Sequence, residues 1–158
     1  MHTRFTHYMT LAIITLFMTL SAPVTANNPS PFQIAVSPKL KIETLKTSEL
    51  SKVFSGRRSN WNNSTPVQLI LLPTGSPEMR WLCDQLKVPE HLLRRFIFQR
   101  VYRAQLRKPI EVSTASEAIQ VLANTPGAIA PLRVNEALIQ SLKASGASPE
   151  LNLIKLTP

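Results

Sequence analysis

Hydrophobic and polar positions along this chain follow the two spacings that distinguish strands from helices. A strand is expected where apolar residues alternate with polar ones, or run on unbroken between turn residues. The run from Val67 to Leu72 is almost wholly apolar, which is typical of a strand covered on both faces. The predicted strands are residues 32–36, 67–72, 110–112 and 128–130, the last ended by Pro131, and residues 151–156, expected at the edge of the sheet.

Helices are predicted where apolar residues recur at intervals of three and four. Most of these segments also carry a start or stop signal, such as a capping hydroxyl, an early proline or a glycine after the last turn. The predicted helices are one from Thr47, its N-cap, to the stop at Gly56; one capped by Ser76, with Pro77 next, that buries Met79, Leu82, Cys83 and Leu86; one opened by Pro89, with Leu92, Leu93, Phe96 and Ile97 as its apolar stripe; one capped by Ser113 or Thr114; and residues 134–142.

Strands and helices alternate along almost the whole chain. This order favours an α/β domain with a mainly parallel sheet and helices on both faces. Two pieces punctuate the order most clearly. One is the helix stop at Gly56 with Trp61 soon after it, and the other is a buried strand that begins after Pro126 and Gly127.

The first 26 residues have the parts of a secretory signal peptide: a cationic start, an apolar run from Met9 to Leu20, and a small-residue exit ending at Ala26. The apolar run is too short to cross a bilayer as a helix, so we expect cleavage rather than an anchor, and no membrane span afterwards. The predicted organisation is a signal peptide over residues 1–26, a flexible leader over 27–31 and one periplasmic domain over 32–158.

Basic residues outnumber acidic ones. The chain has 18 Lys and Arg against 9 Asp and Glu, and only Arg4 among them lies in the signal segment. Such an excess indicates either a solvated basic surface or attraction to a polyanion. Six cations and no anion, interleaved with aromatic residues, form a candidate basic face or the outer side of an ordinary amphipathic helix: Arg94, Arg95, Arg100, Arg103, Arg107 and Lys108.

A turn of Thr74, Gly75 and Ser76 follows the strand at 67–72 and begins a helix. Its hydroxyls and the free amides of a helix start point the same way, so the turn is the best candidate for binding a small anion. Arg57 and Arg58, just past the helix stop, can add positive charge to an adjoining groove. The same residues also serve as a plain helix cap and as solvated arginines, and the sequence leaves both interpretations open.

No catalytic or metal site is predicted. His91 is the one histidine after the signal segment, so a histidine-based metal cluster cannot form. Cys83, the single cysteine, lies in an apolar helical stripe and is expected to be buried, and it has no partner for a disulfide within the chain. The sequence therefore predicts a binding or interaction protein without a cofactor, rather than an enzyme.

Several of these features together resemble the substrate-binding proteins of phosphate ABC transporters, a branch of the type II periplasmic binding fold. Members of that family have two lobes with the anion between them, and this chain has the length of little more than one. The resemblance implies a single-lobe relative, with phosphate or another oxyanion as ligand and an envelope or transporter protein as partner. Since the chain is expected to be secreted, no nucleic acid is expected as a partner. The resemblance covers roughly residues 32–132 and rests on Leu50, Phe54, Gly56, Trp61, Gly75, Ser76, Phe98, Pro126, Gly127, Ala128 and Ile129.

Three positions around the Thr74–Ser76 turn depart from the pattern of that family. Leu72 stands where an arginine is expected, and Pro77 and Glu78 follow Ser76. Proline has no amide hydrogen and glutamate repels an anion, so part of the phosphate cradle is missing or reversed. The sequence predicts a module that binds an oxyanion or is an accessory to a transport or envelope system. The alternative is an envelope interaction protein whose basic face engages a protein partner or an anionic surface.

Overall fold

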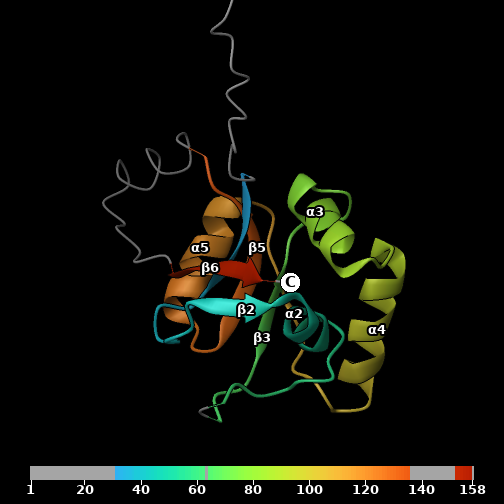
Figure 1. Cartoon of the computed structure of the whole chain (residues 1–158). Helices are drawn as coiled ribbons and strands as arrows, with labels where there is room; N and C mark the ends of the chain where they lie inside the picture. The colour runs from blue at the N-terminus through green and yellow to red at the C-terminus, as the bar shows by residue number, and fades with distance from the viewer. Residues whose placement is uncertain (1–30, 63, 136–151, 158) are drawn as a thin grey trace, which may run out of the picture.

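A six-stranded sheet with helices on both sides forms the part of the chain that the structure, a computed structural model, describes: residues 31–62, 64–135 and 152–157 (Figure 1). The strand order is β2-β6-β1-β5-β3-β4. In chain order the elements are β1 (Phe32–Val36), β2 (Thr44–Lys46), α2 (Thr47–Phe54), β3 (Gln68–Leu71), α3 (Pro77–Leu86), α4 (Glu90–Tyr102), β4 (Ile110–Glu111), α5 (Ala115–Asn124), β5 (Ala128–Arg133) and β6 (Asn152–Thr157).

The direction of the strands confirms the predicted α/β fold with a mainly parallel sheet. Strand β1 pairs antiparallel with both β5 and β6, whereas β2 with β6, β3 with β5 and β3 with β4 are parallel pairs. In Figure 1, α5 lies on one side of the sheet, and α2, α3 and α4 lie on the other. Every residue of β3 is buried, as expected for a strand covered on both faces.

A long-range hydrogen bond joins the two pieces that punctuate the sequence. Trp61 is 3% exposed, and its Nε1 donates to the Gly127 carbonyl at 2.9 Å. Gly127 has a φ of +77°, and a Cβ at this position would lie 2.1 Å from the Pro66 carbonyl oxygen. No other residue fits there without moving the backbone. This hydrogen bond therefore holds the loop after α2 against the start of β5, although the two segments are far apart in sequence.

Two predictions at the start of α2 and at β6 are wrong. Thr47 is the first helical residue rather than the N-cap, and its Oγ1 donates to the Thr157 carbonyl at 3.2 Å. The three-residue strand β2 was not predicted, and it pairs with β6 in the register of Thr44 with Lys155. Strand β6 consequently lies between β2 and β1 rather than at the edge of the sheet.

Pro131 does not end β5, contrary to the prediction. It lies opposite Ile34, in a pair that alternation places between the hydrogen-bonded pairs of β1 and β5. Its missing N–H therefore faces away from β1, toward β3. The pairing of β3 with β5 involves only Ala128 and Ile129 of β5, so no ladder bond is lost at Pro131.

The remaining helices follow their predicted signals, with one correction. Ser76 caps α3 and Thr114 caps α5 through hydrogen bonds from the backbone. In α4 the expected apolar stripe buries Leu93 and Ile97, but Phe96 is 42% exposed. The helix predicted over residues 134–142 lies outside the described residues except for its first two positions, which are not helical.

Candidate functional site

The turn of Thr74, Gly75 and Ser76 connects β3 to α3, and its first two residues are exposed. Gly75 adopts a φ of +76°, which favours glycine, and a side chain there would meet no neighbour. Ser76 Oγ accepts a hydrogen bond from Met79 N at 3.3 Å, and Pro77 occupies the first turn. The hydroxyl of Ser76 is thus used by the helix cap.

A carboxylate from the next helix is hydrogen-bonded to the backbone of this turn. Gly75 N donates to Glu90 Oε2 at 3.0 Å, and Glu90 Oε1 accepts from Arg94 Nε at 2.9 Å. The side chains of Arg94 and Glu90 are only 16% and 15% exposed. Charged hydrogen bonds are stronger when water is largely removed. The turn does hold an anion, and that anion belongs to the chain itself.

Arg94 also reaches the end of β3, where the resemblance expects an arginine at Leu72. Leu72 is buried, and its carbonyl accepts a hydrogen bond from Arg94 Nη2 at 2.7 Å. The sequence predicts Arg94 as part of the basic face and gives Glu90 no role in a site. Their spacing of four residues on a helix, with the acid first, was the signal that could have found the pair.

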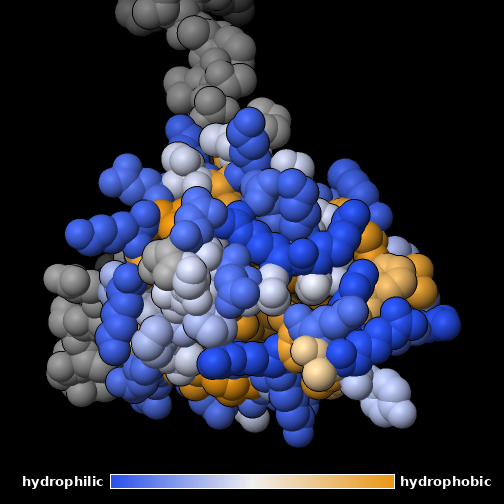
Figure 2. All heavy atoms as spheres, turned by 90° about the horizontal axis from the view of Figure 1, so that it is seen from below, coloured by the Kyte–Doolittle hydropathy of each residue, from blue (hydrophilic) through white to orange (hydrophobic). Residues whose placement is uncertain are grey.

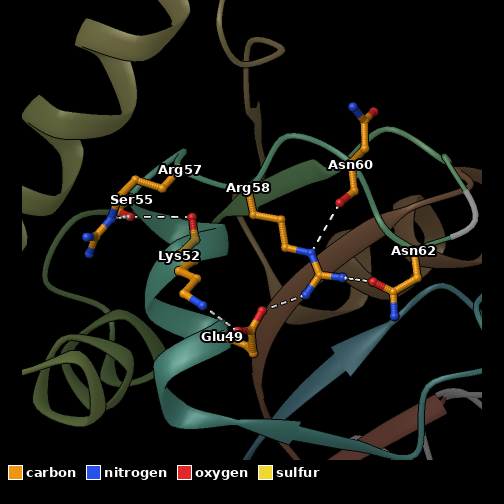
Figure 3. A network of polar contacts seen from close by, with 7 residues as sticks. All are labelled: Glu49, Lys52, Ser55, Arg57, Arg58, Asn60 and Asn62. Carbon is orange, nitrogen blue, oxygen red and sulfur yellow. Dashed lines mark hydrogen bonds and ion pairs between the residues drawn. The ribbon is translucent and has the colours of Figure 1, made fainter.

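Arg57 and Arg58 are neighbours in sequence with different surroundings (Figure 3). The Arg58 guanidinium donates to Glu49 Oε2 at 2.8 Å and to Asn62 Oδ1, and it lies 5.5 Å from the centre of the Trp61 ring. The hydrogen bond from Lys52 lowers the pKa of Glu49, and the charge of Arg58 adds to this effect. Arg58 therefore holds the loop in place.

Arg57 points away from this network, and Figure 3 shows it beside Ser55. Its Nε donates to Ser55 Oγ at 3.1 Å, and its side chain is exposed. It lines a hollow of 380 Å³ between the end of α2 and the second half of α4, which we call the arginine pocket. The pocket is lined by Ser55, Arg57, Phe96, Gln99, Arg100 and Arg103.

The six cations of the predicted basic face do not act together. Arg94 is part of the internal ion pair, whereas Arg100 and Arg103 meet Arg57 at the arginine pocket. Arg95, Arg107 and Lys108 are exposed and do not line this pocket. The structure thus brings two of the six basic-face cations together with Arg57 of the predicted anion site, and it separates Thr74–Ser76 from Arg57 and Arg58. Seen from below, hydrophilic side chains cover most of the surface, and hydrophobic atoms emerge on the side where α4 lies (Figure 2).

The described residues contain no group of three or more His, Cys, Asp or Glu side chains that could hold a metal ion. Cys83 is buried, as predicted, and burial raises the pKa of its thiol, with the charges of Glu90 and Asp84 adding to the effect. A raised pKa makes the thiol a poor nucleophile. Within the part of the chain that the structure describes, no helix is both long and apolar enough to cross a bilayer.

No family model matches the sequence, and no curated protein matches it. Solved structures do match. PstS from Borrelia burgdorferi is 19% identical with a TM-score of 0.54, over 80% of this chain and 47% of that protein. A possible phosphate binding protein from Planctomyces limnophilus DSM 3776 is 16% identical with a TM-score of 0.54, over 80% and 41% of the two chains. An ABC-type phosphate transport receptor from Vibrio cholerae is 12% identical with a TM-score of 0.55, over 79% and 46%.

This chain has the fold of one part of these phosphate-binding proteins. At these identities the likeness shows the fold, and it confirms the resemblance that the sequence indicated. The chain spans less than half of the length of each of the three proteins. It therefore matches only part of each phosphate-binding protein.

Proposed function

We propose that this chain is an exported, non-catalytic binding module that recognises an anionic group on a partner in the envelope, and that it does not carry free phosphate in its Thr74–Ser76 turn. The observation that carries the proposal is the hydrogen bond between Gly75 N and Glu90 Oε2, at 3.0 Å. A free oxyanion would have to displace a carboxylate that Arg94 also holds. The phosphate-binding fold is retained while its anion position is already taken.

The names of the structural neighbours and the buried thiol support a binding protein rather than an enzyme. The signal-like first 26 residues support export. The processed protein would then begin at Asn27, which the N-terminal residue of the protein purified from the envelope fraction would reveal. Its role beside a transporter or another envelope system belongs to the same proposal.

Phosphate titration of the wild-type chain and of Glu90→Ala, followed by the NMR signal of the Gly75 amide, tests the closed turn. In the wild type we expect this signal to stay in place at millimolar phosphate. In Glu90→Ala the amide loses its carboxylate partner and Arg94 keeps only the more distant Glu111, at 3.9 Å, so phosphate should shift the signal saturably and raise the melting temperature. Glu90→Gln, which removes the charge but keeps the size, guards against loss of folding in the alanine variant. Saturable movement of the wild-type signal at micromolar phosphate would show that the turn is an open phosphate site.

A further inference from the structure

The arginine pocket is built by a close approach between α4 and the turn after α2. Gly56 has a φ of +70°, and a Cβ there would lie 2.9 Å from Arg100 Cγ. The backbone of the turn thus rests on the aliphatic stem of Arg100, which places Arg57 beside α4. This contact fixes two guanidinium-bearing residues from different elements at one hollow.

The charged groups of the pocket lack acidic partners. Arg57 Nε is bonded to a serine hydroxyl, and Arg100 Nη1 donates to Gln105 Oε1 at 2.6 Å. The side chain of Arg103 has no hydrogen bond or ion pair among the described residues. No Asp or Glu lines the pocket or occurs between Arg94 and Lys108. Arg58, next to Arg57 in sequence, differs from the arginines of the pocket because it forms an ion pair with Glu49.

The amount of unbalanced charge indicates the valence of a ligand. Helix α2 ends at Phe54 and α4 ends at Tyr102, so two helix C-termini adjoin the pocket. Each contributes roughly half a negative charge, which helps to hold the arginines there. Three guanidinium charges against these two termini leave an excess of roughly two positive charges. A phosphate monoester carries about −1.5 to −2 at neutral pH, which matches this excess better than a single carboxylate does.

One wall of the pocket is apolar. Phe96 lines it and is 42% exposed, although it lies one position from the buried Ile97 in the same helix. Phe98 is equally exposed, at 42%, but it does not line the pocket. A ring held at the rim of a cationic hollow offers a surface for an apolar group attached to the anion.

We propose that the arginine pocket binds a phosphate monoester attached to an apolar group, with the phosphate held by Arg57, Arg100 and Arg103 and the apolar part resting on Phe96. This rests on the proposed function, because it names the anionic group that the module recognises. A soluble organic phosphate and the headgroup of an anionic lipid share this chemistry. The Thr74–Ser76 turn takes no part in the binding.

Calorimetry of the full chain with phenyl phosphate and with inorganic phosphate tests the site. We expect phenyl phosphate to bind about threefold or more tightly than inorganic phosphate, because only its ring can contact Phe96. Arg103→Gln should weaken the binding of phenyl phosphate about tenfold, as expected for loss of a charge-assisted hydrogen bond. Arg95→Gln is the matched control, since it removes one exposed arginine of α4 that does not line the pocket. It should change the affinity by about twofold or less.

The two equally exposed phenylalanines give a second matched pair. Phe96→Ala should abolish the preference for phenyl phosphate over inorganic phosphate, whereas Phe98→Ala should leave it unchanged. Equal weakening by Arg103→Gln and Arg95→Gln would show attraction to net charge alone and would overturn the proposal. Absence of binding of phenyl phosphate to the wild-type chain would overturn it as well.

Vesicles distinguish the two sources of the phosphate. Phosphatidate vesicles that compete with phenyl phosphate, while phosphatidylcholine vesicles do not, would assign the site to a lipid headgroup. Binding of phenyl phosphate without such competition would assign it to a soluble organic phosphate. Neither result depends on the Gly75 amide, so failure of this proposal and failure of the closed turn are observed separately.

Discussion

The Thr74–Ser76 turn and the arginine pocket both combine a tight turn with arginine from α4, yet one contains its own anion and the other does not. At the turn, Glu90 accepts hydrogen bonds from a backbone amide and from Arg94. At the pocket, the side chain of Arg103 has no hydrogen bond or ion pair among the described residues. The carboxylate at the turn thus stabilises the fold, whereas the arginines of the pocket have no acidic partner among its lining residues.

The difference follows from where the carboxylates lie. The sequence provides Glu90 one turn before Arg94, so that pair forms within one helix. It provides no acid from Arg94 to Lys108, so the guanidinium groups in the second half of α4 can meet a carboxylate only from another element. The loop beside them offers Arg57 rather than an acid.

Removal of the internal anion should give the largest effect on stability. Glu90→Ala leaves a largely buried guanidinium and the Gly75 amide without their partner, so we expect the free energy of unfolding to fall by about 2–3 kcal/mol. Arg103→Gln removes a charge that has no partner and should change it by about 0.5 kcal/mol or less. Urea unfolding of both variants measures the contrast. Equal losses of unfolding free energy in the two variants would mean that the turn and the pocket do not differ in the pairing of their charges.

Substitution of the two turn glycines should give a smaller but more selective effect. Gly75→Ala meets open space and carries only the strain of a positive φ, about 1–2 kcal/mol. Gly56→Ala carries the same strain, and its Cβ also presses on the stem of Arg100 at 2.9 Å. Only Gly56→Ala should therefore weaken the binding of phenyl phosphate, which calorimetry of the two variants checks. Similar affinities in both would show that the turn does not position the pocket.

The fold could be predicted from the sequence where local signals and burial agree. The almost wholly apolar run of β3, the cap at Ser76 and the glycine before β5 each determine their own element, and the structure has all three. The errors occurred where a distant partner decides the outcome. The Thr47 hydroxyl is hydrogen-bonded to the end of β6, and Pro131 is tolerated in β5 because the pairing with β3 does not extend to it.

The candidate site was predictable only in part, for the same reason. The turn was recognised from its residues, but its occupation by Glu90 depends on how α4 packs after α3. Burial of Leu93 and Ile97 sets the rotation of α4, and this leaves Phe96 at the rim of the pocket. The meeting of Arg57 with Arg100 requires the close approach at Gly56, which no spacing along the chain reveals.

The contrast between a paired and an open arginine recurs at Arg58 and Arg57, and pH should reveal it. The pKa of Glu49 is lowered from its ordinary value of 4.5, first by the hydrogen bond from Lys52 and then by the charge of Arg58. A carboxylate with a lowered pKa stabilises the folded state above its unfolded pKa, and this contribution is lost as the pH falls through the folded value. Glu49→Gln should therefore lessen the loss of stability on the acid side, below about pH 4.5, in urea unfolding at a series of pH values. The effect is the smallest of the three, because both side chains are accessible to water and salt screens them.

Glu43→Gln, an exposed carboxylate without an ion pair among the described residues, is the control and should leave the acid limb as it is in the wild type. If both variants followed the wild-type curve, Arg58 would be as independent of a carboxylate as Arg57 is.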